Sequence, residues 1–186
     1  MAVVLDVNGY VKPPFMGDDV EGCIVKISEG RDVDADYDVQ VQNAVGQRKP
    51  VGVYCYTHAR TPERAAEEAR VVINKLKERP DLDLSIGVFI DMEDANMPDT
   101  SPFGRAEIIM GFINELTKWR NDINVGVYSG YYAMRDSIDT DALPPYVKLW
   151  VAQYNDNCDW PDPYLWQFTD GYVIDGTKYD ANVWYK

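Results

Sequence analysis

The chain has 186 residues, of which 46% are hydrophobic and 12% aromatic, enough to bury the core of one globular domain. Its net charge is −13 and its 18 lysines and arginines are scattered, which argues against nucleic acid or an anionic membrane as a partner. No apolar run approaches the roughly 18 residues of a membrane span. The first residues lack the basic region and longer apolar core of a secretory signal, so we expect synthesis in the cytoplasm without a signal peptide.

Short runs of β-branched and aromatic residues, bounded by turn formers, predict strands along the chain. They are expected at residues 3–7, 22–27, 50–56, 86–90, 124–129, 149–154, 164–169 and 181–185. Between the early strands, apolar residues at helical spacing predict helices at residues 35–48, from Pro62 after the cap residue Thr61 to a stop at Pro80, and at residues 105–120.

After residue 129 the pattern changes to strands joined by loops rather than by long helices. Early β-α alternation followed by shorter returns predicts an α/β fold. We expect one domain over residues 1–186, an irregular TIM-like β/α barrel with incomplete helical cladding in its C-terminal part.

The cysteines and the single histidine do not indicate a disulfide framework, a zinc site or a catalytic triad. Cys23, Cys55 and Cys158 are an odd set without paired spacing, so free thiols are expected rather than disulfides. One histidine, His58, argues against a histidine-rich zinc site, and no cofactor is expected. Without a Gly-x-Ser-x-Gly elbow to support a Ser-His-Asp triad, we interpret His58 as a solvated turn residue.

The predicted strand at residues 86–90 runs directly into two carboxylates, Asp91 and Glu93. Side chains alternate along a strand, so these two point the same way, ~6.6 Å apart along the backbone. Two such groups in unequal environments suit acid-base work on a glycosidic bond, because one can stay protonated while the other is charged. The alternative is an acidic loop, or the N-terminus of a helix, which favours negative charge.

Other strand ends of the predicted barrel also carry acidic, amide or aromatic side chains. In such barrels the active site is built from the C-terminal ends of different strands. These positions are Asp6, Glu29, Tyr56, Tyr128, Gln153, Tyr154 and Gln167.

Several ordered motifs make the chain similar to the family 25 glycoside hydrolases, the Chalaropsis-type lysozymes. The similarity runs from Val4 to Trp184. The motifs are Leu5-Asp6-Val7, Val25-Lys26-Ile27-Ser28-Glu29-Gly30, Gly52-Val53-Tyr54-Cys55-Tyr56, Ile90-Asp91-Met92-Glu93, Leu149-Trp150-Val151-Ala152-Gln153-Tyr154, Leu165-Trp166-Gln167-Phe168 and Asp180-Ala181-Asn182-Val183-Trp184. The chain departs from the family pattern at Cys55, where histidine is frequent, and at Trp184, where phenylalanine is common.

The resemblance implies a muramidase that hydrolyses the β-1,4 bond between N-acetylmuramic acid and N-acetylglucosamine in peptidoglycan. It makes Glu93 the general acid and completes the acidic cleft with Asp91, Asp6 and Asp180. The substrate-binding residues expected with it are Glu29, Tyr56, Tyr128, Gln153, Tyr154, Trp166 and Gln167. Without a separate wall-binding module, the chain resembles the catalytic domain of a phage endolysin, expected to be a monomer that acts at the bacterial cell wall.

Three other functions compete with this interpretation. A chitinase-like barrel also uses Asp-x-Glu, but usually has a further Asp two residues upstream, where this chain has Phe89. A non-catalytic carbohydrate-binding barrel would not need both Asp91 and Glu93 as acids. A divalent-metal phosphodiesterase normally needs histidines or a basic phosphate clamp. The sequence leaves open whether cleavage retains or inverts configuration, and we favour retention with assistance from the substrate's N-acetyl group.

Overall fold

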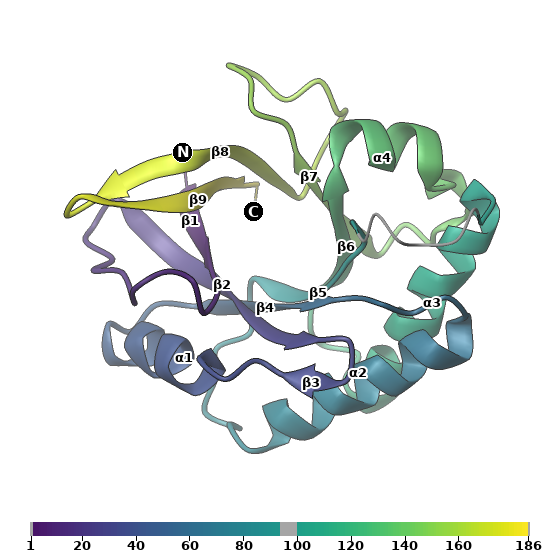
Figure 1. The fold of residues 1–186 in the computed structure, drawn as a ribbon, viewed down its shortest axis with the longest axis horizontal. Coiled ribbons are helices and arrows are strands. Elements are labelled where there is room, and N and C mark those ends of the chain that lie inside the picture. The colour runs from purple at the N-terminus through teal and green to yellow at the C-terminus, as the bar shows by residue number, and fades with distance from the viewer. Residues whose placement is uncertain (1, 94–99, 186) are drawn as a thin grey trace.

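The computed structural model describes residues 2–93 and 100–185, and Figure 1 shows the arrangement of their elements. Eight strands close into one barrel, in the order β1-β2-β4-β5-β6-β7-β8-β9 and back to β1. Their bounds are β1 Ala2–Val7, β2 Val20–Glu29, β4 Val51–Tyr56, β5 Gly87–Asp91, β6 Val125–Gly130, β7 Val147–Ala152, β8 Leu165–Ile174 and β9 Thr177–Trp184. The expected irregular β/α barrel is confirmed.

Neighbouring strands are parallel except around β9. This last strand pairs antiparallel with both β8 and β1, and so closes the barrel between the two ends of the chain. A two-residue strand, β3 Asp32–Val33, pairs antiparallel with the end of β2. The sequence did not predict β3, because two residues are too short to show an alternating pattern.

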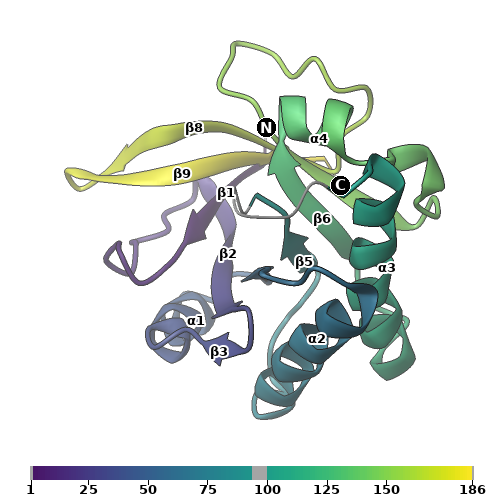
Figure 2. The same ribbon diagram turned by 45° about the vertical axis from the view of Figure 1, so that its right-hand side comes forward.

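Helices cover only part of the barrel. They are α1 Tyr37–Gly46, α2 Pro62–Lys77, α3 Pro102–Trp119 and α4 Tyr131–Ser137, with a 3-10 turn, η1, at Thr140–Ala142. Figure 2 shows α2 and α3 side by side beyond β5 and β6. The described residues between β1 and β2, and between β7 and β8, contain no helix, so the cladding is incomplete as expected. The short helix α4 was not predicted.

Local signals explain where the two long helices begin. The Thr61 hydroxyl accepts a hydrogen bond from the Arg64 N–H at 3.3 Å, and Pro62 occupies the first turn. Helix α3 begins three residues before its expected start, because Ser101 caps it by accepting from the Gly104 N–H at 3.1 Å. Both caps satisfy donors that the first helical turn leaves unpaired.

The core has two parts, one on each side of the strands. Inside the barrel, large side chains form a plug in which the Trp150 ring lies 5.4 Å from Phe89 and 6.1 Å from Tyr54, centre to centre. Outside, aliphatic side chains of the strands pack against the apolar faces of the helices. Phe112 of α3 and Val72 of α2 are buried on these helix faces. The plug leaves the C-terminal end of the barrel as the place where polar side chains can gather.

The hairpin formed by β8 and β9 is longer than expected and projects past the barrel, at the left of Figure 1. Its turn contains Asp175 and Gly176, with φ of 48° and 78°. Two consecutive residues with positive φ are typical of the tight turn that matches the twist of a hairpin. The described helices include none long and apolar enough to cross a membrane. Cys23, Cys55 and Cys158 are free thiols, as expected.

Candidate active site

Strand β5 places two carboxyl side chains at the C-terminal edge of the barrel. Asp91 is its last residue and is buried, whereas Glu93 lies two residues further along and is exposed. The peptide between them is held from the neighbouring strand: the Met92 N–H donates to the Tyr128 carbonyl and the Ser129 hydroxyl donates to the Met92 carbonyl, both at 2.9 Å. This Asp-x-Glu segment is therefore fixed by β6.

The first and last strands bring two more carboxyl groups to the same edge. Asp6 of β1 lies directly opposite Asp180 of β9 in the antiparallel ladder. Asp6 is buried, and its Oδ2 accepts from the side-chain amides of Gln167 at 2.8 Å and Asn182 at 3.1 Å. Closure of the barrel thus joins acids from opposite ends of the chain.

All four carboxyl groups line one cavity of about 210 Å³ at the mouth of the barrel. Its remaining walls are Asn8, Lys26, Tyr54, Tyr56, Tyr128, Trp150 and Gln167. A second cavity, of about 430 Å³, adjoins it and shares Glu93 and Tyr128. The second cavity lies between the start of α4 and the end of β7, where Tyr132 and Tyr154 are exposed. Together the two cavities make a recess with acids at one end and tyrosines at the other.

Burial and the charges of neighbouring acids raise the pKa of each acid in the first cavity. Burial, and next the charge of Asp180, raises the pKa of Asp6 from 3.8 to about 7. Burial and then the charge of Glu93 raise the pKa of Asp91 well above its usual range. Partial desolvation and then Asp180 raise the pKa of Glu93, although it reaches solvent. The cluster therefore holds protons at pH values where isolated carboxyl groups have lost them, as a general acid must.

Asp91 offers an acceptor that the described residues do not use. Its Oδ1 is buried and has no hydrogen-bond partner among residues 2–93 and 100–185. A buried polar atom without a partner is costly, and it marks a position where a ligand or water can bind.

A tyrosine and glutamine network connects the two cavities. The hydroxyls of Tyr128 and Tyr154 both donate to Gln167 Oε1, at 3.0 and 2.9 Å. Because the Gln167 amide nitrogen donates to Asp6, the network fixes the orientation of that amide. Hydroxyl and amide groups of this kind can position a sugar through its own hydroxyl and acetamido groups.

The structure brings most of the sequence-predicted site residues together. The first cavity is lined by Asp6, Tyr56, Asp91, Glu93, Tyr128, Gln167 and Asp180, and the second by Gln153 and Tyr154. Glu29 and Trp166 line neither cavity. Trp166 lies between Leu165 and Gln167, which both face the barrel interior, so strand alternation turns its ring outward. Its indole N–H donates to the Gln153 carbonyl at 2.7 Å.

Four residues that line the first cavity were not among the predicted site residues. They are Asn8, Lys26, Tyr54 and Trp150. Lys26 could have been found by alternation, because it follows the interior residue Ile24 by two positions on β2. Asn182, which holds Asp6, was likewise not singled out.

His58 is more than the solvated turn residue that the sequence predicted. It follows the end of β4, and its side chain is 47% exposed, but its Nε2 lies 3.2 Å from Glu29 Oε1. Within the described parts of the chain, no group of three His, Cys, Asp or Glu side chains is arranged to hold a metal ion.

Comparison with known proteins adds to this geometry. The family model described as Glycosyl hydrolases family 25 matches residues 14–177. Asp91 and Glu93 lie inside that range, and Asp6 and Asp180 lie just outside it. No curated protein sequence matches the chain.

Solved structures share the fold at low sequence identity. The modular autolysin LytC from Streptococcus pneumoniae, solved with a synthetic peptidoglycan ligand, is 21% identical with a TM-score of 0.83, covering 99% of this chain and 46% of that one. The chain therefore spans about half the length of LytC. The catalytic domain of endolysin ply40 from bacteriophage P40 of Listeria monocytogenes is 20% identical with a TM-score of 0.81, covering 100% and 93%. A family 25 glycosyl hydrolase from Bacillus anthracis is 19% identical with a TM-score of 0.78, covering 100% and 89%.

Proposed function

Because the chain belongs to glycosyl hydrolases family 25, we propose that it is a muramidase acting on the glycan strands of bacterial peptidoglycan. The bond cleaved in this proposal is the β-1,4 bond between N-acetylmuramic acid and N-acetylglucosamine. One observation carries the proposal: a single cavity joins Asp91 and Glu93 of β5 with Asp6 and Asp180 of the closing strands. The peptidoglycan ligand of LytC and the endolysin origin of ply40 support this substrate.

Glu93 serves as the general acid in the proposed reaction. It stands at the mouth of the cavity, where a leaving-group oxygen can reach it, and its raised pKa keeps a proton on the carboxyl. Protonation of the glycosidic oxygen by Glu93 lets the C1–O bond break and gives the leaving sugar a hydroxyl. The same carboxylate then takes a proton from the water that completes hydrolysis.

Asp91 supports the developing charge at the anomeric carbon. Its Oδ1, which has no hydrogen-bond partner among the described residues, can accept the N–H of an N-acetyl group, and this would direct the acetamido oxygen towards C1. We therefore include assistance by the substrate's own N-acetyl group, with retention of configuration, in the proposal. Asp6 and Asp180 add negative potential, and Gln167 with Tyr128 and Tyr154 binds the sugar hydroxyls. One chain supplies all these groups, so a monomer without a cofactor suffices.

A Glu93→Gln variant tests the proposal. The amide keeps the size of the side chain but has no acidic proton to transfer, and acid-base assistance is typically worth about 10²–10⁴ in rate. We expect purified bacterial walls to be cleared at least about 100-fold more slowly, with an unchanged melting temperature. Glu107→Gln, on the exposed face of α3, is the matched control and should retain full activity. Near wild-type lysis by the Glu93→Gln protein would refute the assignment.

The products identify the bond. Borohydride reduction of a wall digest should give muramitol at the reducing ends, measured by mass analysis. Glucosaminitol would instead identify an N-acetylglucosaminidase. Anhydro-muropeptides would identify a lytic transglycosylase, in which a hydroxyl of the muramic acid replaces water.

A further inference from the structure

Lys26 is a cation inside an acidic cavity, and the proposed function gives it no task. It follows Ile24 by two residues on β2, so its side chain points into the barrel and is only 11% exposed. Among the described residues that line the first cavity it is the one positively charged side chain. A lysine placed this deep loses solvation and rotamer freedom, so its position requires compensating partners.

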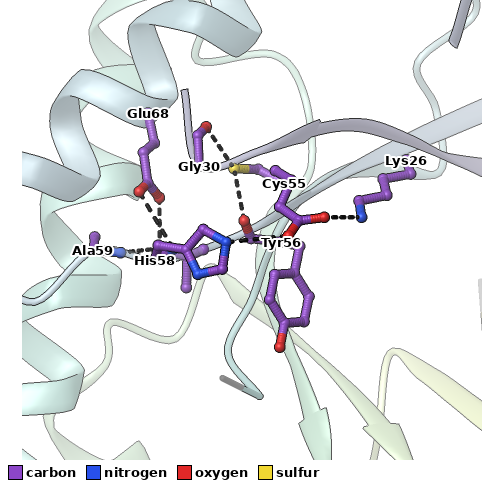
Figure 3. A network of polar contacts seen from close by, with 9 residues as sticks. Lys26, Gly30, Cys55, Tyr56, His58, Ala59 and Glu68 are labelled. Carbon is purple, nitrogen blue, oxygen red and sulfur yellow. Dashed lines mark hydrogen bonds and ion pairs between the residues drawn. The ribbon is translucent and has the colours of Figure 1, made fainter. Parts of the chain in front are cut away.

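Those partners form a chain of contacts that leads away from the cavity. Lys26 Nζ donates to Glu29 Oε2 at 2.7 Å, and the other oxygen, Oε1, lies 3.2 Å from His58 Nε2. The Tyr56 ring contacts both Lys26 and His58: its centre lies 5.5 Å from Lys26 Nζ and 5.4 Å from the centre of the His58 ring. Figure 3 shows Lys26, Tyr56 and His58 in this network.

The far end of the network is anchored to a helix. Glu68 of α2 is buried, and its two oxygens accept from the Thr57 hydroxyl at 2.6 Å and the His58 N–H at 3.3 Å. The Thr57 N–H also donates to the Asp91 carbonyl at 3.0 Å. The turn that carries His58 is therefore fixed both to α2 and to the end of β5, and its imidazole contacts Glu29. Figure 3 shows His58 beside Glu68 of α2.

A nearby cation would stabilise the charged form of Asp91. Burial favours its neutral form, yet the proposed reaction requires it to carry negative charge beside the anomeric carbon. Among the described residues that line the cavity, the charged and titratable groups around Asp91 are the acids Asp6, Glu93 and Asp180, the phenols of Tyr54, Tyr56 and Tyr128, and Lys26. Lys26 alone among these lowers the pKa of Asp91.

We propose that Lys26, which shares the cavity with Asp91, favours the charged form of Asp91 against burial and the neighbouring acids, and that Glu29 and His58 are positioning residues, which act on Asp91 only by fixing Lys26. The effect of Lys26 on catalysis rests on the proposed function, whereas its effect on the charge of Asp91 does not. It also gives Glu29, expected from the sequence to bind substrate, a different task.

The Asp91 titration, followed by carbon-detected NMR of the side-chain carboxyl groups in the intact protein, tests this directly. In Lys26→Met the midpoint for Asp91 should rise by up to about one pH unit, because the change removes the one described positive charge that shares the cavity with Asp91, and a nearby opposite charge lowers a carboxyl pKa by about 1–3 units. Lys26→Arg should restore most of the shift. Lys118→Met, which removes the same charge from an exposed ion pair on α3, should change nothing. An unchanged midpoint in a folded Lys26→Met protein would overturn the proposal.

Glu29→Gln separates positioning from simple charge. As a mere anionic neighbour, Glu29 would raise the Asp91 pKa, so its neutralisation would lower the midpoint. As a positioning residue it keeps Lys26 in place, so its loss should raise the midpoint, and His58→Ala should shift it the same way by less. A lower midpoint in Glu29→Gln would contradict the positioning role, and no shift in His58→Ala would remove His58 from it.

The catalytic consequence appears in the pH profile of wall lysis. The acidic limb of kcat/KM should move up in Lys26→Met by the same amount as the Asp91 midpoint, with the basic limb unchanged. An acidic limb that stays in place while the midpoint shifts would overturn the link to catalysis. If the wild-type chain does not cleave walls, the proposed function fails, while the NMR titration still decides the role of Lys26.

Discussion

The two sides of the barrel are stabilised in different ways. Strands β2, β4, β5 and β6 carry α1, α2 and α3 on their outer faces and are held by apolar packing. Strands β7, β8, β9 and β1 are joined by loops and a hairpin, without a long helix in the described residues. On this second side, side-chain hydrogen bonds inside the barrel tie the strands together.

Asn182 of β9 is the centre of those hydrogen bonds. Its Oδ1 accepts from the Trp150 indole at 2.6 Å, and its Nδ2 donates to the Val4 carbonyl and to Asp6 Oδ2, both at 3.1 Å. Polar groups here stabilise the fold and orient the acid at once. On the helix-covered side the two tasks are separate: packing behind β5 holds the strand, and Asp91 Oδ1 has no hydrogen-bond partner in the part of the chain that the structure describes.

A Phe112→Ala substitution should have the largest effect on stability. Phe112 is fully buried in α3 against the strands, and removing a core phenylalanine costs about 3–5 kcal/mol through lost burial and a residual cavity. The free energy of unfolding, measured by denaturant titration, should fall by that amount, while wall lysis per folded molecule stays unchanged. Phe103→Ala, on an exposed position of the same helix, should cost far less. Equal losses would show that α3 does not stabilise the barrel by packing.

Asn182→Ala should have a smaller effect on stability and a larger one on activity. It leaves the Trp150 indole N–H and the Val4 carbonyl without their partner, at about 1–3 kcal/mol for a buried group. It also removes one donor from Asp6. Denaturant titration and wall lysis should both decline, whereas exposed Asn114→Ala should change neither. Full activity in Asn182→Ala would contradict the double role of the polar side of the barrel.

Asp6→Asn should have the smallest effect near pH 4, where the wild-type side chain is neutral in the folded protein, and an effect that grows as the pH rises. The folded pKa of Asp6 is raised from 3.8 to about 7, so between these values the native state binds a proton that the unfolded state has lost. The wild-type free energy of unfolding therefore contains a contribution that falls as pH rises towards 7, and the variant lacks it. Melting curves should show that the stability of the variant increases relative to that of the wild type from pH 4 to pH 7. Exposed Asp18→Asn should show no such trend, and a parallel course for Asp6→Asn would refute the raised pKa.

The alternating and helical patterns were enough to predict the barrel strands, the helices α1, α2 and α3, and the Asp91–Glu93 pair. They failed for the short elements β3 and α4, where too few residues exist to show a period. The prediction also missed the directions in which Trp166 and Lys26 point. Trp166 faces outward and Lys26 inward, and both could have been assigned by counting from Leu165 and Ile24, once those residues are known to be interior.

The sequence by itself determined which segments alternate, where α2 begins, and that two acids follow a buried strand, because these depend on neighbours within a few residues. Only the tertiary structure decided that Asp6 meets Asp180, since that contact requires β9 to close the barrel antiparallel to β1. It likewise decided that Glu29 does not line the cavity but contacts Lys26 through one carboxylate oxygen and His58 through the other. Such contacts join residues far apart in the chain, and the registers that create them are set by the packing of the whole barrel.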